Sequence, residues 1–343
     1  MTSAIAPSLR PVVRWLLTGC VLIACMVAIG GITRLTGSGL SITEWKPIMG
    51  ALPPANEVEW QEAFDKYKRI PEYTLVNQHM DLAGFKRIFF WEYLHRNWGR
   101  LMGLVFMVPF VVFWRKGLLK GWLMRRGLVI LVGGGLVGAL GWFMVASGLE
   151  KNPDVSHFRL AIHLCAAFTV FAIVLWTVFD IHNGPSAWGG NGTAEARWAR
   201  ALLWLLVLQI VYGAFTAGLD AGRIYNTWPL MNGQFMPENV RAFGDLVKDL
   251  TDHKDGVQFV HRNLAWLVAA AFVGFAIRFR ERVGVADTWK WLMAAVLLQF
   301  VLGVLTVVMQ VPIVLGVLHQ FGALLLLSAL LATLHGTGRR LSA

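Results

Sequence analysis

Charged residues are scarce in this chain of 343 residues. They make up 15% of the sequence, whereas apolar residues make up 56%, and a soluble globular domain has about 25% charged residues. The composition excludes a soluble globular protein and indicates an integral membrane protein. The net charge of +11 does not indicate nucleic-acid binding, because much of the excess of Lys and Arg lies in short clusters beside apolar runs, as membrane topology requires.

Cysteine is almost absent as well. The three cysteines are Cys20, Cys25 and Cys165, and each lies inside an apolar run. The sequence therefore has no loop cysteine for a disulfide outside the cell, and no C-x-x-C pattern for zinc or for covalent haem attachment. The first apolar run follows Arg10 and resembles a signal peptide, but it is long enough to span a bilayer, so we expect a retained helix.

Long apolar runs dominate the rest of the chain. Each can cross a hydrocarbon core about 30 Å thick, which takes about 20 helical residues. An even number of such spans places both termini on the same side of the membrane. We expect eight transmembrane helices, near residues 12–32, 90–114, 126–147, 158–181, 198–219, 258–279, 288–309 and 312–335.

Basic residues indicate which side of the membrane holds the termini. Basic clusters join the second span to the third and the sixth to the seventh, and the chain ends with Arg339 and Arg340 before its last residues. By the positive-inside rule, these linkers and both termini are cytoplasmic. The long connections 34–88 and 220–256 then face outward, and we expect the first to carry a short amphipathic helix after Pro53 and Pro54.

The two halves of the chain repeat each other. Because four spans return the chain to its starting side, such halves are parallel repeats related by an axis along the membrane normal. We predict an all-α integral membrane protein of two tandem, pseudo-symmetric four-helix bundles, residues 1–182 and 183–343. The matching segments are 31–33 with 213–216, 45–50 with 228–233, and 138–141 with 301–304.

Four of the nine histidines lie at matching depths in the predicted spans. His95, His163, His261 and His319 lie near the outer ends of the even-numbered spans, roughly 6 to 11 Å deep at the helical rise per residue. A lone histidine on an apolar helix is usually a hydrogen-bonded helix contact, whereas one per even-numbered span in both halves favours ligands. Solvated or capping roles are expected for the other five: His79, His157, His182, His253 and His335.

Haem fits these four ligands better than zinc does. Zinc needs three or four close donors in a tetrahedral arrangement, whereas two imidazoles on facing helices clamp a flat macrocycle from both sides. Pairing within each half gives His95 with His163 and His261 with His319, and hence two haem sites. Pairing across the halves stays open at the level of sequence.

The charged residues beside these histidines are only partly repeated. Arg96 and Arg262 directly follow a histidine, and each either meets haem propionates or extends to the interface as an ordinary snorkelling arginine. Three residues before the histidine, the first half has Glu92 and the second half has Gln258. A carboxylate one turn from an axial ligand can act as a base or stabilise positive charge at the macrocycle edge. The alternative is that Glu92 pairs with Arg96 or Arg100 at helical spacing.

Together these residues resemble the haem A synthase family. The likeness rests on the stretch 30–41, on Glu92-x-x-His95-Arg96, on His261-Arg262-Asn263 and on Leu318-His319-Gln320. It covers about residues 12–336, and its motifs are specific in combination. Some members carry a cysteine pair in the first outer loop, and this chain resembles the class without it.

The resemblance implies an oxidoreductase that converts the C8 methyl group of haem O to a formyl group, through an alcohol, and so makes haem A for cytochrome oxidase. Carried over by position, Glu92 is the catalytic carboxylate. His95 and His163 hold the iron of the substrate haem, and His261 and His319 hold the iron of a haem b that helps electron transfer.

The resemblance also implies a location and partners. The location is a cell membrane, the inner membrane in bacteria, with the haem sites toward the outer, periplasmic side. The partners are haem O synthase, which is the upstream farnesyltransferase, and oxidase assembly factors. The sequence leaves open the electron acceptor, the source of the oxygen atom (water or O₂), and a homo-oligomer, because glycine runs such as 133–135 suit helix contacts within or between chains.

Two other functions fit four membrane histidines. One is a dihaem b-type electron carrier, linked to quinol and without haem-modifying activity, and the other is a haem transporter or chaperone. An electron carrier needs no carboxylate in only one of its halves, so the difference between Glu92 and Gln258 favours the enzyme.

Overall fold

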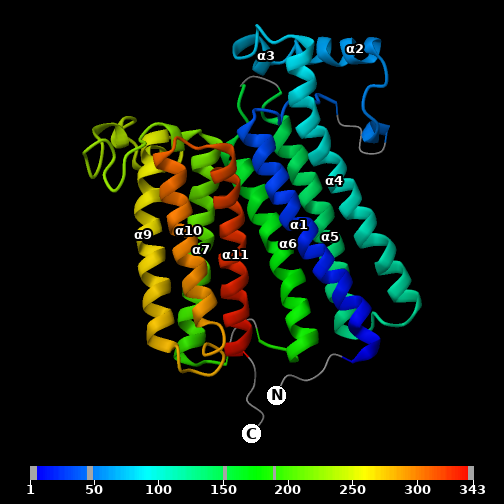
Figure 1. Ribbon diagram of the computed structural model, residues 1–343, viewed down its shortest axis with the longest axis vertical. Helices are drawn as coiled ribbons and strands as arrows, with labels where there is room; N and C mark the ends of the chain where they lie inside the picture. Colours follow the sequence, from blue (N-terminus) through cyan, green and yellow to red (C-terminus); the bar gives the residue numbers. More distant parts are fainter. Residues whose placement is uncertain (1–5, 45–48, 150–152, 188–190, 339–343) are drawn as a thin grey trace.

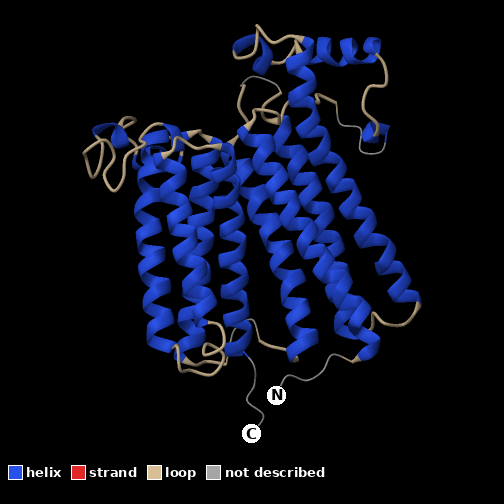
Figure 2. Ribbon diagram, in the orientation of Figure 1, coloured by secondary structure: helices blue, strands red, loops and turns tan. Residues whose placement is uncertain are grey.

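The computed structural model describes residues 6–44, 49–149, 153–187 and 191–338 (Figure 1). Within these ranges the regular structure is helical, with no strand (Figure 2), and an isolated bridge pairs Met231 with Gln234. Residues 45–48 of the repeated segment 45–50, and the predicted topogenic pair Arg339 and Arg340, lie outside the described ranges.

Eight helices of the described residues are long and apolar enough to cross a membrane. This number confirms the predicted spans, and each predicted range lies inside its helix or differs from it by one residue at an end. The helices are α1 (Arg10–Leu35), α4 (Leu82–Arg115), α5 (Gly121–Ala146), α6 (His157–Asn183), α7 (Ala194–Gly218), α9 (Lys254–Phe279), α10 (Trp289–Val308) and α11 (Ile313–Gly338).

Capping side chains set where several of these helices begin. The Asp81 carboxylate accepts a hydrogen bond from Gly84 N at 2.7 Å, which satisfies a backbone donor that the helix itself leaves unpaired. Ser156 and Thr193 cap α6 and α7 in the same way. As a result α4 starts eight residues before the predicted span, and its first two turns lie beyond the apolar stretch.

The spanning helices pack in a pattern that repeats in the two halves. In the first half, α1 and α5 each pack on both α4 and α6. In the second half, α7 and α10 each pack on both α9 and α11. Between the halves, α1 contacts α11, α6 contacts α7, and α6 contacts α11. If each helix of the first half is exchanged for its counterpart in the second half, the same set of contacts between the halves results. Tandem, pseudo-symmetric bundles require such a pattern. The tandem arrangement itself, the division between residues 182 and 183, and the cytoplasmic termini stay predictions.

A layer of short helices covers the end of the bundle opposite the two termini (Figure 1). It contains α2 (Glu57–Tyr67) and α3 (Pro71–Leu75) after α1, and α8 (Leu246–Thr251) before α9. The helix predicted after Pro53 and Pro54 is therefore confirmed as α2. Its apolar side packs on the first turns of α4, where the rings of Phe64 and Phe85 stack with centroids 5.1 Å apart. Short 3-10 turns complete the described elements at Pro7–Leu9, Met49–Ala51, Ala221–Arg223 and Glu238–Arg241.

Polar contacts join the two halves at both ends of the bundle. At the end near the termini, Asp180 of α6 accepts from His335 Nε2 of α11 at 3.1 Å and from Arg126 Nη2 of α5 at 3.3 Å. The solvated role predicted for His335 is wrong, because its side chain is 1% exposed and the Asp180 carboxylate supplies the partner that burial demands. At the opposite end, Arg34 Nη2 of α1 lies 2.9 Å from Asp220 Oδ2, just beyond α7.

Candidate functional site

A cavity of about 1090 Å³ runs through both halves of the bundle. Both halves contribute to its wall, and the spanning helices provide most of it. It brings together all the site residues predicted from the sequence, which are His95, His163, His261, His319, Glu92, Arg96 and Arg262.

Each of the four imidazoles lies against a glycine of a neighbouring helix. Any larger residue at these glycines would push on the ring, because protein interiors are close-packed and real Cβ atoms rarely come so near. The pairs, with the distance from an added Cβ to the nearest imidazole atom, are Gly30–His95 (3.1 Å), Gly141–His163 (3.1 Å), Gly213–His261 (3.3 Å) and Gly303–His319 (2.9 Å).

Sequence reasoning missed the role of these glycines, although the repeat contained the signal. Matching Thr33 with Thr216 already places Gly30 opposite Gly213. In the other pair of segments the predicted register is wrong by one residue, because matching 138–141 with 301–304 places Gly141 opposite Val304. In the structure, the glycine that faces the imidazole is Gly303.

The histidines come together within each half. The rings of His261 and His319 have centroids 6.4 Å apart and planes at 83°. With metal–nitrogen bonds of about 2.0–2.1 Å, two imidazoles on opposite faces of one metal have centroids about 6 Å apart. The spacing of this pair therefore fits a haem iron between the rings. In the first half, His95 and His163 both line the cavity from their helices.

The ring nitrogens of the two pairs have different neighbours. His261 Nδ1 lies 3.2 Å from the side-chain amide of Gln209 in α7. A contact of this kind fixes the orientation of a ligand imidazole. At the matching position the first half has Met26, whose side chain offers no such amide. The second-half site is thus the more firmly preset of the two.

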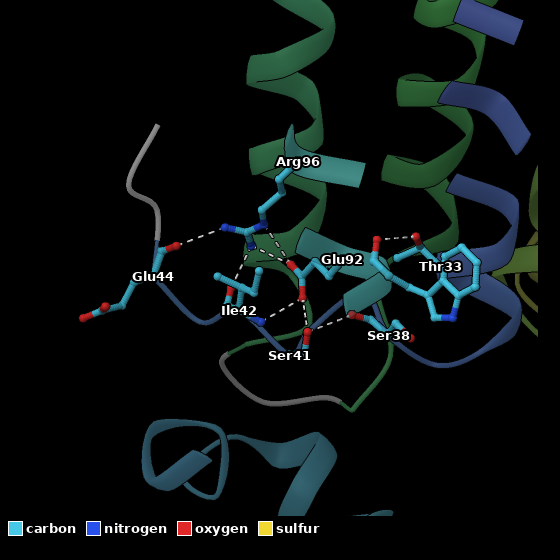
Figure 3. Close-up of polar contacts among 8 residues, drawn as sticks. Thr33, Ser38, Ser41, Ile42, Glu44, Glu92 and Arg96 are labelled. Atoms are coloured by element: carbon cyan, nitrogen blue, oxygen red, sulfur yellow. Dashed lines mark hydrogen bonds and ion pairs between the residues drawn. The ribbon is translucent and has the colours of Figure 1, made fainter. Parts of the chain in front are cut away.

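Glu92 is buried in a network that joins α4 to the segment after α1 (Figure 3). Its side chain lines the cavity and the residue is only 3% exposed. Its Oε1 lies 2.6 Å from Arg96 Nη2, and its Oε2 accepts from Ser41 Oγ at 2.7 Å and from Ile42 N at 2.8 Å. The ion pair with Arg96 is thus present in a residue that also lines the cavity.

Gln258 occupies the corresponding place in the second half and is 1% exposed. Its Nε2 donates to Tyr225 O at 3.0 Å, while its Oε1 makes no hydrogen bond to any described residue. The amide thus keeps a contact to the outer segment but brings no charge. The difference predicted between the halves is present in the structure as one buried carboxylate and one buried amide.

The two arginines hold the outer segments against the spanning helices. Arg96 donates to Ile42 O at 2.7 Å and to Glu44 O at 3.0 Å, and Arg262 donates to Thr227 O at 2.7 Å. Both also line the cavity. Sequence reasoning missed this anchoring of backbone carbonyls, because it depends on contacts between segments far apart in the chain.

Comparison with known proteins places these features in context. A family model described as cytochrome oxidase assembly protein matches residues 13–331. The chain is 45% identical to the heme A synthase of Flavobacterium johnsoniae over 333 residues, covering 95% of this chain and 97% of that protein. It is 46% identical to the heme A synthase of Parvibaculum lavamentivorans over 310 residues, covering 90% and 89%, and 42% identical to that of Sphingopyxis alaskensis over 341 residues, covering 99% and 95%.

Proposed function

Because the chain belongs to the family of cytochrome oxidase assembly proteins that includes the heme A synthases, we propose that it makes haem A from haem O. The reaction oxidises the C8 methyl group of the substrate to an alcohol and then to a formyl group, which makes the protein an oxidoreductase acting on a CH group. The observation that carries this proposal is the buried Glu92 carboxylate at the cavity wall, at the position where the second half has the uncharged amide of Gln258.

The two histidine pairs divide the haems between the halves. His95 and His163 hold the substrate, haem O, beside Glu92. His261 and His319 hold haem b, a role supported by their ring spacing of 6.4 Å and by the contact of His261 with Gln209. When bound, haem b supplies electron transfer. Each imidazole needs its facing glycine, since a Cβ there would meet the ring.

Glu92 acts on the edge of the substrate in this proposal. Arg96 and Ser41 donate hydrogen bonds to its two oxygens, so the carboxylate is held in one position rather than free to rotate. A fixed buried carboxylate stabilises positive charge that develops nearby and can accept a proton from the group being oxidised. The amide of Gln258 can do neither at full strength, which assigns the chemistry to the first half.

The decisive experiment replaces Glu92 by Gln and analyses the haem. Cells that supply haem O would express the wild type and the variant, and the haems extracted from each purified protein would be separated. We expect the Glu92→Gln protein to keep haem O and haem b, with its conversion to haem A lower by about 10²-fold or more. The reverse exchange in the other half, Gln258→Glu, is the matched control and should leave conversion unchanged.

The outcomes separate the proposal from its competitors. Full conversion by Glu92→Gln would refute a catalytic role for Glu92. Loss of haem O from the variant would make Glu92 a structural anchor instead. If the wild type itself returned haem O unchanged, a dihaem electron carrier or a haem transporter would be the better description.

We further propose that the termini are cytoplasmic and that the histidine pairs lie toward the outer side of a bacterial cell membrane. The support is the basic clusters at the ends of the spanning helices on the side of the termini, such as Arg115 and Lys116, because such residues remain in the cytoplasm. Haem O synthase and oxidase assembly factors are the partners expected there.

A further inference from the structure

The cavity extends farther along the first half than along the second. On α4 its lining continues to Met107, twelve residues past His95, or about 18 Å of helix. On α9 it ends at Ala269, eight residues past His261, or about 12 Å of helix. The first half therefore has a deeper extension, between α4 and α5, without a counterpart in the second-half lining.

The second half closes the corresponding gap with aromatic rings. Trp266 of α9 packs on Phe300 of α10 with centroids 4.7 Å apart, and Trp228 stacks on Trp266 at 5.5 Å. All three rings line the cavity, and Trp266 and Trp228 are 48% and 40% exposed. Bulky rings thus border the second-half site at the place where a long substituent of a haem held by His261 and His319 would pass.

The first half has small residues where the second has bulky ones. With Gly141 matched to Gly303, the residue opposite Phe300 is Gly138, and the one opposite Leu297 is Gly135. A Cβ added at either glycine would meet no atom within 4 Å, and both line the cavity. The first half also has no counterpart of the Trp266 ring, because Arg100 occupies the matching position. Arg100 Nη1 donates to Asn97 Oδ1 at 2.7 Å.

The arrangement of the helices agrees with the lining. α4 packs more loosely against α5 than α9 does against α10, and Figure 1 shows α4 leaning away from the bundle toward its C-terminal end. Deeper than Arg100, the lining of this extension is apolar. We call it the α4–α5 slot, defined by Gly103, Met107, Leu131, Gly135 and Gly138.

We propose that the α4–α5 slot binds the isoprenoid side chain of the substrate haem. The inference rests on the proposed function, in which the first half holds haem O. Haem O carries a farnesyl-derived chain that haem b lacks, and the slot is continuous with the site of His95 and His163. In a bilayer the isoprenoid chain leaves lipid rather than water, so its affinity for the slot comes from close packing against the apolar walls.

The slot also explains how one chain sorts two similar haems. Both half-sites offer a pair of imidazoles, so the histidines alone do not select between haem O and haem b. A haem with a long tail fits only the half with the slot, since Trp266 and Phe300 occupy the matching space in the other. The tail-free haem fits either half, so the rings act by excluding haem O from the second half.

The experiment fills the slot and measures binding rather than turnover. Gly138→Phe introduces the second-half residue. Purified protein that retains its second-half haem would be titrated with haem O and, separately, with protohaem, and binding to the first-half site would be followed by absorbance. We expect the variant to bind haem O at least about tenfold more weakly, while its affinity for protohaem changes by less than about threefold. Gly274→Phe is the control, because Gly274 also has no atom within 4 Å of an added Cβ and lies outside the cavity.

Each result decides the question. An equal loss for both haems would show that Gly138 borders the macrocycle rather than the tail, and no loss for either would show that the slot holds no ligand; both overturn the proposal. If Gly138→Phe failed to retain the second-half haem, Gly135→Leu would be titrated in the same way. If the wild type bound haem O selectively but made no haem A, the proposed function would be refuted, whereas the proposal that the slot binds the isoprenoid chain would be supported.

Discussion

At the scale of single residues, the half-sites depend on glycines as much as on histidines. Each imidazole stands against a glycine, and the closest approach is at Gly303, where an added Cβ would lie 2.9 Å from His319. An imidazole fixed on a packed helix cannot move away easily. The positions of the four imidazoles, the proposed haem ligands, therefore depend on glycines that themselves bind nothing.

This dependence predicts the effect of a single methyl group. Gly303→Ala should displace the His319 ring and lower the haem b content of the purified protein, measured as haem per protein by absorbance. Gly274→Ala is the matched control, since its added methyl meets no atom within 4 Å. A normal haem b content and spectrum in Gly303→Ala would remove His319 from the ligand set or show that the ring adjusts freely.

At the scale of elements, α4 supports two structures at once. Its middle carries His95 and Glu92 into the cavity, and its first turns carry the outer layer of α2 and α3. Within that layer, Glu72 of α3 is 8% exposed, and its Oε2 makes no hydrogen bond to the part of the chain that the structure describes.

Burial raises the pKa of Glu72 to about 7, although a hydrogen bond from Tyr67 acts to lower it. Nearby Glu92 and Asp154 add to the rise, and Arg34 opposes it. Because the pKa is higher in the folded than in the unfolded state, the protonated carboxyl stabilises the layer at low pH, and that contribution is lost as pH rises through about 7.

The outer layer should therefore loosen between about pH 5 and pH 8. The rate of amide hydrogen exchange in residues 57–75, measured by mass spectrometry, should rise over this pH range by more than the intrinsic chemical exchange rate does. Glu72→Gln removes the titrating group and should flatten the dependence. An unchanged slope in this variant would assign the effect to another residue.

At the scale of the whole molecule, two of the side-chain contacts that join the halves differ in burial. The pair of Asp180 with His335 has side chains that are 5% and 1% exposed, whereas that of Arg34 with Asp220 has 30% and 37%. Leaving one partner of a buried pair alone costs about 3–5 kcal/mol, while an exposed pair contributes about 1 kcal/mol or less.

The two pairs should thus respond unequally to mutation. Asp180→Ala should lower the thermal unfolding midpoint of the detergent-solubilised protein strongly, because His335 and Arg126 lose their shared carboxylate. Asp220→Ala should lower it only slightly. Equal shifts in the two variants would contradict a dominant role for the buried contact in joining the halves.

Residue type and spacing along the chain were enough to predict the spanning helices and to single out the residues of the proposed site. Apolar runs predict helices reliably because a bilayer offers no partner for backbone polar groups, so each span must satisfy its own. The repeat likewise singled out His95, His163, His261 and His319, and the difference between Glu92 and Gln258. These features depend only on residue type and spacing along one helix.

How those residues meet depends on the packing of the helices, which the sequence pattern does not contain. The close pairing of His261 with His319, the one-residue shift that sets Gly303 opposite Gly141, and the burial of His335 against Asp180 all depend on how helices far apart in the sequence are rotated against each other. The slot beside α4 depends on it as well. Helix rotation follows from packing between many side chains, and the spacing of residues within one helix does not contain that information.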